Sequence, residues 1–206
     1  MYDPIIDGKR FTFGVSGKLY KAALVMYDRQ TESLWSQLMQ EAIAGPMTGA
    51  KLAILPSLHT TWEYWRAQHP QTLVLSPETG FRRDYGLNPY QEYWEMGQPP
   101  RFRRPPKAKK SNVKLRPMER VLGLSVDGAK KAYPFSVLKT KPERFEDQIR
   151  GKKVIIHVDK KSETGYVTDE RGTLIPSIAL FWFAWSDFYP DTEVYGEEPS
   201  RQRPVR

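Results

Sequence analysis

The sequence predicts a β-rich α+β fold made of two unequal repeats, each an antiparallel β-meander plus one short Trp-bearing helix. The first observation behind this prediction is a nineteen-residue pattern that begins at Pro56 and returns at Pro176. The second is an Asp-Gly pair near the start of each half, and the third is a series of short strand-like runs. Together they indicate a duplicated unit whose two descendants share one architecture.

The repeated pattern spans residues 56–74 and 176–194 and aligns without a gap. Seven positions are identical: Pro56/Pro176, Ser57/Ser177, Trp62/Trp182, Trp65/Trp185, Pro70/Pro190, Thr72/Thr192 and Val74/Val194. Tryptophans three residues apart lie on one helix face, and Thr61 can cap the first helix. Each proline ends its helix, and the Thr-x-Val that follows is predicted to start a strand.

We expect the tryptophans of each helix to cover a sheet, so that two incomplete cores complete one another. On this hypothesis Trp65→Ala lowers the free energy of unfolding by about 3–5 kcal/mol.

Asp-Gly pairs predict one tight hairpin in each half, at residues 7–8 and 127–128. Asp-Gly accommodates the positive φ angles of a type I′ turn, which matches the twist of paired strands. Apolar runs flanked by turn residues predict further strands. They are 11–15, 22–27, 33–38, 41–44, 51–55, 153–158, 165–168 and 173–175. The second half is thus expected to be a shortened copy without an equivalent of residues 34–50.

A basic, proline-rich segment at residues 98–116 separates the two halves. It holds eight Lys and Arg residues and no acidic residue. The charge of this segment therefore equals the formal net charge of the whole chain, +8. Prolines lack a hydrogen-bond donor and favour extended backbone, so we interpret this segment as a solvent-exposed linker. The expected organisation is a first repeat at 1–97, the linker at 98–116, a second repeat at 117–197 and a disordered tail at 198–206.

Composition limits the class of protein. A chain of 206 residues with 39% hydrophobic and 27% charged residues can bury a sizeable core. With no cysteine, the chain cannot form a disulfide, a thiolate zinc site or a cysteine nucleophile. Its apolar runs are too short to span a bilayer, and no signal-peptide pattern is visible at the start, so the chain as written is predicted to be cytosolic.

The strongest candidates for a binding site form a polar-aromatic set. Its members are Asp28, Arg29, Trp35, Gln37 and His59. The charged pair could bind a ligand carboxylate or a sugar, with the indole as a stacking surface. The alternative is a type I turn that starts at Asp28 and leads into an ordinary strand.

The sequence contains no catalytic motif of the nucleotide-binding, serine-hydrolase or zinc-protease type, so it names no nucleophile, base or cofactor. The three histidines, His59, His69 and His157, lack the i, i+4 spacing of a helical zinc site. Structural roles are favoured for them. A metal site of two histidines and a carboxylate that forms only in three dimensions is the alternative.

Many motifs resemble the prokaryotic DUF3179 family of unknown function. Among them are F-G-V-S-G at 13–17, M-Y-D-R-Q-T-E-S-L-W-S-Q at 26–37, E-A-I-A-G at 41–45, H-T-T-W at 59–62, T-G-F at 79–81, E-R-V-L-G at 119–123 and K-A-Y-P at 131–134. The resemblance covers most of residues 8 to 195 and implies no reaction. It implies a further segment before Tyr2, with a Tyr-Cys-Pro-type stretch and often an export or lipoprotein signal. On that basis we expect an extracytoplasmic protein if Met1 is not the true start.

Three functional hypotheses follow from these patterns. The first is a non-catalytic binding or structural domain of an extracytoplasmic protein, with a small-molecule, glycan or peptide ligand. The second is an enzyme, metal-assisted in one version, whose site is incomplete in this chain. The third and weakest is nucleic-acid binding through the linker, where Phe102 is the lone aromatic residue among the charges. The first predicts an open groove around the polar-aromatic set, whereas the second predicts a deep pocket where His59 meets a carboxylate.

Overall fold

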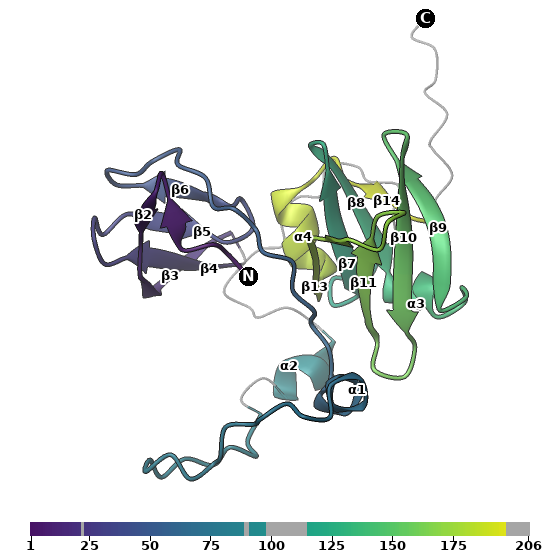
Figure 1. Ribbon diagram of the computed structural model, residues 1–206, viewed down its shortest axis with the longest axis horizontal. Coiled ribbons are helices and arrows are strands. Elements are labelled where there is room, and N and C mark those ends of the chain that lie inside the picture. Colours follow the sequence, from purple (N-terminus) through teal and green to yellow (C-terminus); the bar gives the residue numbers. More distant parts are fainter. Residues whose placement is uncertain (22, 89–90, 98–114, 197–206) are drawn as a thin grey trace, which may run out of the picture.

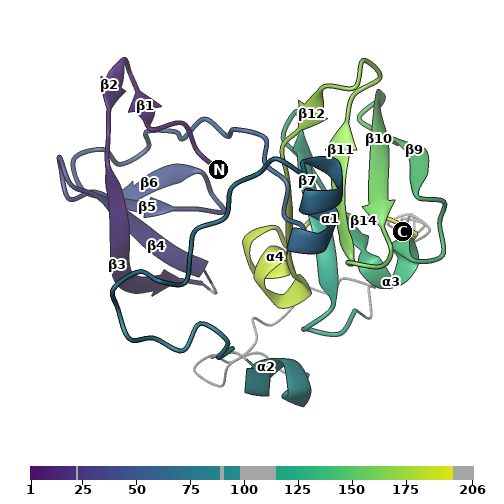
Figure 2. The same cartoon turned by 60° about the horizontal axis from the view of Figure 1, so that its bottom comes forward.

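The computed structural model describes residues 1–21, 23–88, 91–97 and 115–196. These residues form a β-rich α+β protein, which confirms the predicted fold class (Figure 1). The strands of the first half and those of the second half lie side by side in both views (Figure 2). The predicted linker, apart from residues 115–116, and the predicted tail lie outside the described residues.

The first half contains a short hairpin and a four-stranded antiparallel meander in the order β3-β4-β5-β6. The strands are β1 (Ile5–Ile6), β2 (Lys9–Arg10), β3 (Phe13–Tyr20), β4 (Ala23–Asp28), β5 (Leu34–Ser36) and β6 (Glu41–Ala44). Asp7 and Gly8 have φ angles of 48° and 74°, as the predicted type I′ turn requires. The predicted strand at 51–55 forms only two isolated bridges, from Lys51 to Glu41 and from Ile54 to Tyr2.

The second half contains two four-stranded sheets, in the orders β13-β7-β8-β14 and β12-β11-β10-β9. Their strands are β7 (Arg120–Val126), β8 (Ala129–Pro134), β9 (Arg144–Ile149), β10 (Lys152–Asp159), β11 (Thr164–Thr168), β12 (Leu174–Ile175), β13 (Ser177–Phe181) and β14 (Glu193–Val194). Every pair is antiparallel except β14 with β8, which is parallel. Asp127 and Gly128 again have positive φ angles, 47° and 79°.

Side chains from both of these sheets form one apolar core. Leu122 and Leu124 of β7 meet Ile156 of β10 and Val167 of β11, together with Phe135 of the short helix α3 (Phe135–Leu138). A smaller core under the first meander contains Trp35 and Phe11. Each half is therefore closed by its own buried apolar residues.

The repeated pattern forms the two predicted helices, α1 (Trp62–Gln68) and α4 (Trp182–Phe188). Thr61 caps α1, since its hydroxyl accepts a hydrogen bond of 3.2 Å from the backbone N–H of Tyr64. Both helices end before the prolines at 70 and 190. The helices and their boundaries are thus set by local sequence.

The burial of the two helices differs, and here the sequence-based prediction is half wrong. Trp182 and Trp185 of α4 are 8% and 2% exposed and pack beside Val121 and Ala132. By contrast Trp62 of α1 is 47% exposed, and no residue of this fully described helix is buried. The reason is that the cavity between α1 and the second half is lined by polar side chains such as those of Glu143 and His157, so the described residues offer α1 no buried apolar surface. The meander of the first half fills its core with its own side chains.

Instead, α1 lies against the β10–β11 hairpin of the second half (Figure 2). Lys161 Nζ pairs with Glu63 Oε1 at 2.5 Å, and the hydroxyls of Thr60 and Thr164 are 3.4 Å apart. After α1, residues 69–88 are all described and form no strand, so the strand predicted at Thr72 is absent. The equivalent prediction in the second copy is confirmed by β14.

The helix α2 (Gln91–Met96) was not predicted. Within the described part of the chain, none of the helices has the length and hydropathy needed to cross a bilayer.

Candidate functional site

Asp28 and Trp35 of the predicted set form a buried node of the first half. Both residues are 0% exposed. Asp28 Oδ2 accepts a hydrogen bond of 2.8 Å from Trp35 Nε1, and Oδ1 accepts one of 2.6 Å from the backbone N–H of Thr31. Burial raises the pKa of Asp28, but these donors outweigh it, and the pKa is lowered overall. In this fold the node holds the β4–β5 turn together, and neither side chain reaches solvent.

Arg29 lies at the surface beside this node. Its guanidinium donates to the backbone carbonyl of Phe13 and lies 5.7 Å from the centroid of the Tyr27 ring. These two contacts hold the side chain against β3 and β4. The structure therefore does not bring Arg29 together with the remaining members of the predicted set.

Gln37 and His59 do come together, in a cavity of about 430 Å³ between the two halves. We call it the inter-half cavity. The first half contributes residues that include Tyr2, Gln37, Leu38, Ser57 and His59, and the second half contributes residues that include Ser125, Ser177, Ala179 and Tyr189. Among the described residues that line it, none is Asp, Glu, Lys or Arg.

The two copies of the repeated pattern face each other across this cavity. Ser57 and Ser177 are equivalent positions of the repeat, as are His59 and Ala179, and all four line the same space. Residues of both copies of the pattern therefore contribute to the lining of the cavity.

Two tyrosine hydroxyls form hydrogen bonds at the cavity, one within the first half and one between the halves. Tyr2 donates a hydrogen bond of 2.6 Å to the backbone carbonyl of Gln37, and Tyr189 of the second half donates one to the carbonyl of Leu38. Burial raises the pKa of Tyr189 to about 12, with a smaller contribution from Tyr2. Burial also raises the pKa of Tyr2. Both groups are thus neutral donors at physiological pH.

The edge strand β13 forms part of the cavity wall, at the end of the order β13-β7-β8-β14. Just beyond the end of β13, Trp182 lies opposite Glu119, and its N–H donates a hydrogen bond of 2.7 Å to the carbonyl of Glu119. Hydrogen-bonded and non-hydrogen-bonded residue pairs alternate along an antiparallel ladder. Since the Trp182 pair is hydrogen-bonded, every second residue before it, Leu180 and Ile178, also forms main-chain hydrogen bonds with β7. The main-chain groups of Ser177 and Ala179 consequently point away from β7, towards the open edge.

His59 also lines a second cavity, of about 350 Å³, between α1 and the β10–β11 hairpin. His157, Glu143 and Asp159 contribute to its lining. His157 stacks on Tyr166 with ring centroids 4.4 Å apart, and its Nε2 lies 3.0 Å from Thr168 Oγ1. Burial, and then the positive charge of Arg144, lower the pKa of His157. This ring is held by its neighbours and favours the neutral form.

The enzyme hypothesis predicts a pocket where His59 meets a carboxylate, and the second cavity brings His59, Glu143 and Asp159 into one lining. Among the described residues, no hydrogen bond joins His59 to a carboxylate, and no group of three or more His, Asp or Glu residues is arranged to hold a metal ion. The nearest approach to a catalytic pair is at the inter-half cavity, where Lys130 Nζ donates to Ser125 Oγ over 2.7 Å. Burial lowers the pKa of Lys130.

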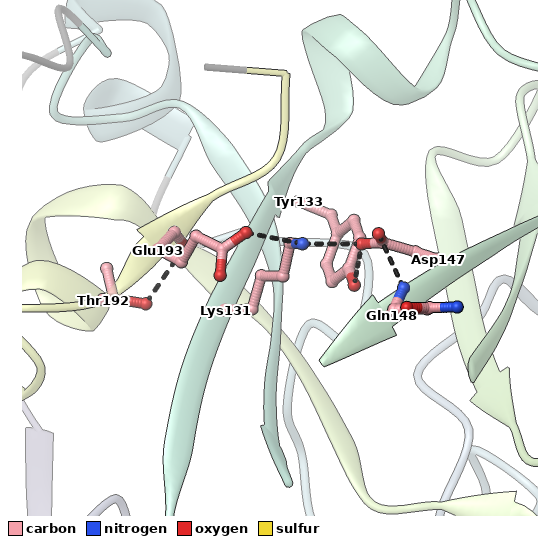
Figure 3. A network of polar contacts seen from close by, with 6 residues as sticks. All are labelled: Lys131, Tyr133, Asp147, Gln148, Thr192 and Glu193. Atoms are coloured by element: carbon pink, nitrogen blue, oxygen red, sulfur yellow. Dashed lines mark hydrogen bonds and ion pairs between the residues drawn. The ribbon is translucent and has the colours of Figure 1, made fainter. Parts of the chain in front are cut away.

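An ionic network around the buried Lys131 lies elsewhere in the second half (Figure 3). Lys131 Nζ of β8 contacts Asp147 of β9 at 2.8 Å and Glu193 of β14 at 2.6 Å, and Tyr133 donates to Asp147 over 2.7 Å. Burial lowers the pKa of Lys131, but the two carboxylates outweigh it, and the pKa is raised overall. Burial and Asp147 raise the pKa of Tyr133. The network ties three strands together and lies outside both cavities.

Sequence reasoning missed Tyr2, Tyr189 and Ser177 as cavity residues. A signal for Ser177 was present, because Pro-Ser opens both copies of the repeat. Tyr2 and Tyr189 carried no such signal, since their position depends on how the two halves meet.

Comparison with known proteins identifies the family and nothing narrower. No curated protein and no solved structure matches this chain at a significant level. A family model described as a protein of unknown function, DUF3179, matches residues 1–192. The expectation drawn from the sequence motifs is thereby confirmed, and the chain belongs to the DUF3179 family.

Proposed function

We propose that this protein is a non-catalytic binding domain whose site is the inter-half cavity and whose ligand is an extended, uncharged peptide segment. The single observation that carries the proposal is the open edge of β13 within that cavity. A strand at the edge of a sheet presents unpaired main-chain groups, which an extended peptide can satisfy by adding as a further strand.

The chemistry of the lining supports an uncharged ligand. The walls combine amides and hydroxyls, such as those of Gln37, Ser57 and Ser177, with aliphatic side chains such as Leu38 and Ile178. The two cationic groups at the border of the cavity, the Met1 ammonium and Lys130 Nζ, already bond to Ser57 and Ser125. The described lining contains no Asp, Glu, Lys or Arg side chain, so a charged ligand group would be desolvated with no lining side chain of opposite charge to pair with. A peptide backbone with small polar and β-branched side chains matches it in both respects. A volume of about 430 Å³ is also within the usual range for ligand sites.

The orientation of β13 supports strand addition in particular. The main-chain groups of Ser177 and Ala179 point towards the open edge, and both residues line the cavity. Opposite them lies the segment around Ser57 and His59, which forms no regular strand in the described residues. A peptide placed between these walls would bond to β13 on one side and contact Gln37 and His59 on the other.

The proposal is tested with a capped, neutral pentapeptide, acetyl-Ser-Val-Thr-Val-Ser-amide, titrated into the full chain by calorimetry. We expect saturable binding with a Kd between about 1 μM and 1 mM. The matched control is the same peptide N-methylated at alternate residues, which removes the donors that strand addition uses. That control is expected to bind at least about tenfold more weakly.

A variant of the protein completes the test. Ala179→Pro removes an edge N–H that does not bond to β7, a position where proline is tolerated. The variant is expected to keep its melting temperature within a few degrees and to bind the pentapeptide at least about tenfold more weakly. Equal affinity of the variant and the native chain, or no binding of the pentapeptide at about 1 mM, would overturn the proposal.

A further inference from the structure

The segment from residue 177 to 195, which we call the α4 module, shows how the repeated pattern is anchored in this fold. Three of its residues, Trp182, Trp185 and Val194, are buried together with Val121 of β7 and Ala132 of β8. The β7–β8 hairpin is therefore the surface on which the module packs.

The fit between module and hairpin depends on a glycine. A Cβ added at Gly123 of β7 would lie 2.3 Å from Cζ3 of Trp185, which is closer than atoms can approach. The ring therefore rests directly on the backbone of β7. The end of the module adds to β8 as a parallel strand, and the N–H of Tyr195 donates to the carbonyl of Ala132 over 2.9 Å.

The equivalent segment from residue 57 to 75, the α1 module, keeps all three anchoring residues, as Trp62, Trp65 and Val74. It also keeps the local geometry. Trp65 Nε1 donates to Thr72 Oγ1 over 2.9 Å, and Trp185 Nε1 donates to Thr192 Oγ1 over 3.0 Å. The residues that contact the hairpin in one module are thus present, in the same local arrangement, in the other.

In the α1 module, however, Trp65 is only half-buried, and the other two residues are exposed. Trp62 is 47% exposed and Val74 is 63% exposed, and Leu73 and Leu75 on either side of Val74 are each 95% exposed. A contiguous run of aliphatic residues this exposed is a mark of an interaction surface. Because the α4 module shows what covers the same residues, the nature of the missing partner can be specified.

We propose that the α1 module is a docking surface for a β-hairpin of the β7–β8 type that is not among the described residues. The hairpin places a glycine beneath Trp65 and small aliphatic side chains beneath Trp62. Its second strand accepts residues 73–75 as a parallel neighbour, as β8 accepts β14. A second copy of this chain does not supply the hairpin, because its own β7 and β8 lie between β13 and β14 and under α4.

The test supplies such a hairpin to the intact chain. A second copy of residues 117–139 is fused through a Gly/Ser linker ahead of Met1, whose N-terminal ammonium group lies 3.3 Å from Ser57 Oγ at the start of the α1 module. A short flexible linker gives an effective concentration in the millimolar range, so even weak docking is populated. Amide hydrogen exchange at residues 72–75 is expected to slow by at least about tenfold relative to the unfused chain.

Two matched controls separate docking from a general effect of fusion. The first carries Gly123→Leu in the appended hairpin only, and the second carries Val74→Lys in the α1 module, where the side chain is exposed and the fold does not depend on it. Each is expected to restore fast exchange at residues 72–75. Failure of the native fusion to slow exchange, or equal slowing in either control, would overturn the proposal. So would an unfused chain that sediments as a dimer with residues 72–75 already protected.

Discussion

The α1 and α4 modules carry the same sequence pattern, and they share local structure while they differ in burial. In both, the indole of the second tryptophan donates to a threonine seven residues later and packs on the ring four residues later. Only α4 is covered, with Trp182 and Trp185 against β7 and β8. Helix formation and the Trp–Thr hydrogen bond therefore depend on the local sequence, whereas burial depends on whether a hairpin such as β7–β8 lies beneath the helix.

The largest effect expected from this comparison is on stability. Trp185→Ala removes a ring that is 2% exposed, and we expect it to lower the free energy of unfolding by about 3–5 kcal/mol. Trp65→Ala, which the sequence alone placed in the same range, is now expected to cost less than about 1 kcal/mol, because no residue of α1 is buried. Urea melts of the two variants make the measurement. Equal costs would contradict the difference in burial.

The features that the sequence predicted correctly are those fixed over a few residues. Both Asp-Gly hairpins, the cap at Thr61 and the ends of the two helices are of this kind. The burial of α1 was wrong because it depends on which sheet face lies beneath the helix. β13 was missed because its apolar residues lead directly into α4 and lack the alternation of a strand.

The candidate site was predictable only in part, for a similar reason. Gln37 and His59 were named from the sequence and line the inter-half cavity. Asp28 and Trp35 were named on the same grounds and lie in the core, because their polar groups satisfy each other in the fold. A sequence shows that a carboxylate and an indole are close along the chain. It does not show whether their hydrogen bonds are made to each other or to a ligand.

The glycine beneath Trp185 gives the second test of the comparison. Gly123→Ala forces a Cβ into the indole ring, and we expect a cost of about 1–3 kcal/mol in a urea melt. In the Trp185→Ala background the ring is gone, so the same change should cost much less. A double-mutant cycle with a coupling below about 0.5 kcal/mol would mean that the ring does not rest on β7.

The shared Trp–Thr hydrogen bond gives a smaller contrast. Thr192→Val leaves the Nε1–H of Trp185 without its acceptor at a buried site, and we expect a cost of about 1–3 kcal/mol. Thr72→Val breaks the equivalent bond where water can replace the hydroxyl, and we expect less than about 0.5 kcal/mol. Thermal melts of the two variants under identical conditions compare these costs. A larger cost for Thr72→Val would reverse the ranking of the modules.

The smallest expected effect is a dependence on alkaline pH. Tyr189 occupies the position of His69 in the repeat, and its pKa is raised to about 12 in the folded state. In the unfolded chain the phenol ionises near pH 10, so the contribution of Tyr189 to stability is complete below pH 10 and is lost as pH rises to about 12. Tyr189→Phe should lose less stability than the native chain over this interval. Identical pH profiles would place the hydroxyl in solvent and remove its bond to Leu38.

The central claim is that the two modules differ in burial because the β7–β8 hairpin covers the α4 module and not the α1 module. Native-state hydrogen exchange tests it most directly, by comparing amides of residues 62–75 with amides of residues 182–195 in the unmodified chain. Exchange in the α4 module is predicted to require an opening close to global unfolding, while exchange in the α1 module proceeds through local opening that denaturant barely affects. Equal protection of the two modules would show that both are covered and would contradict the account.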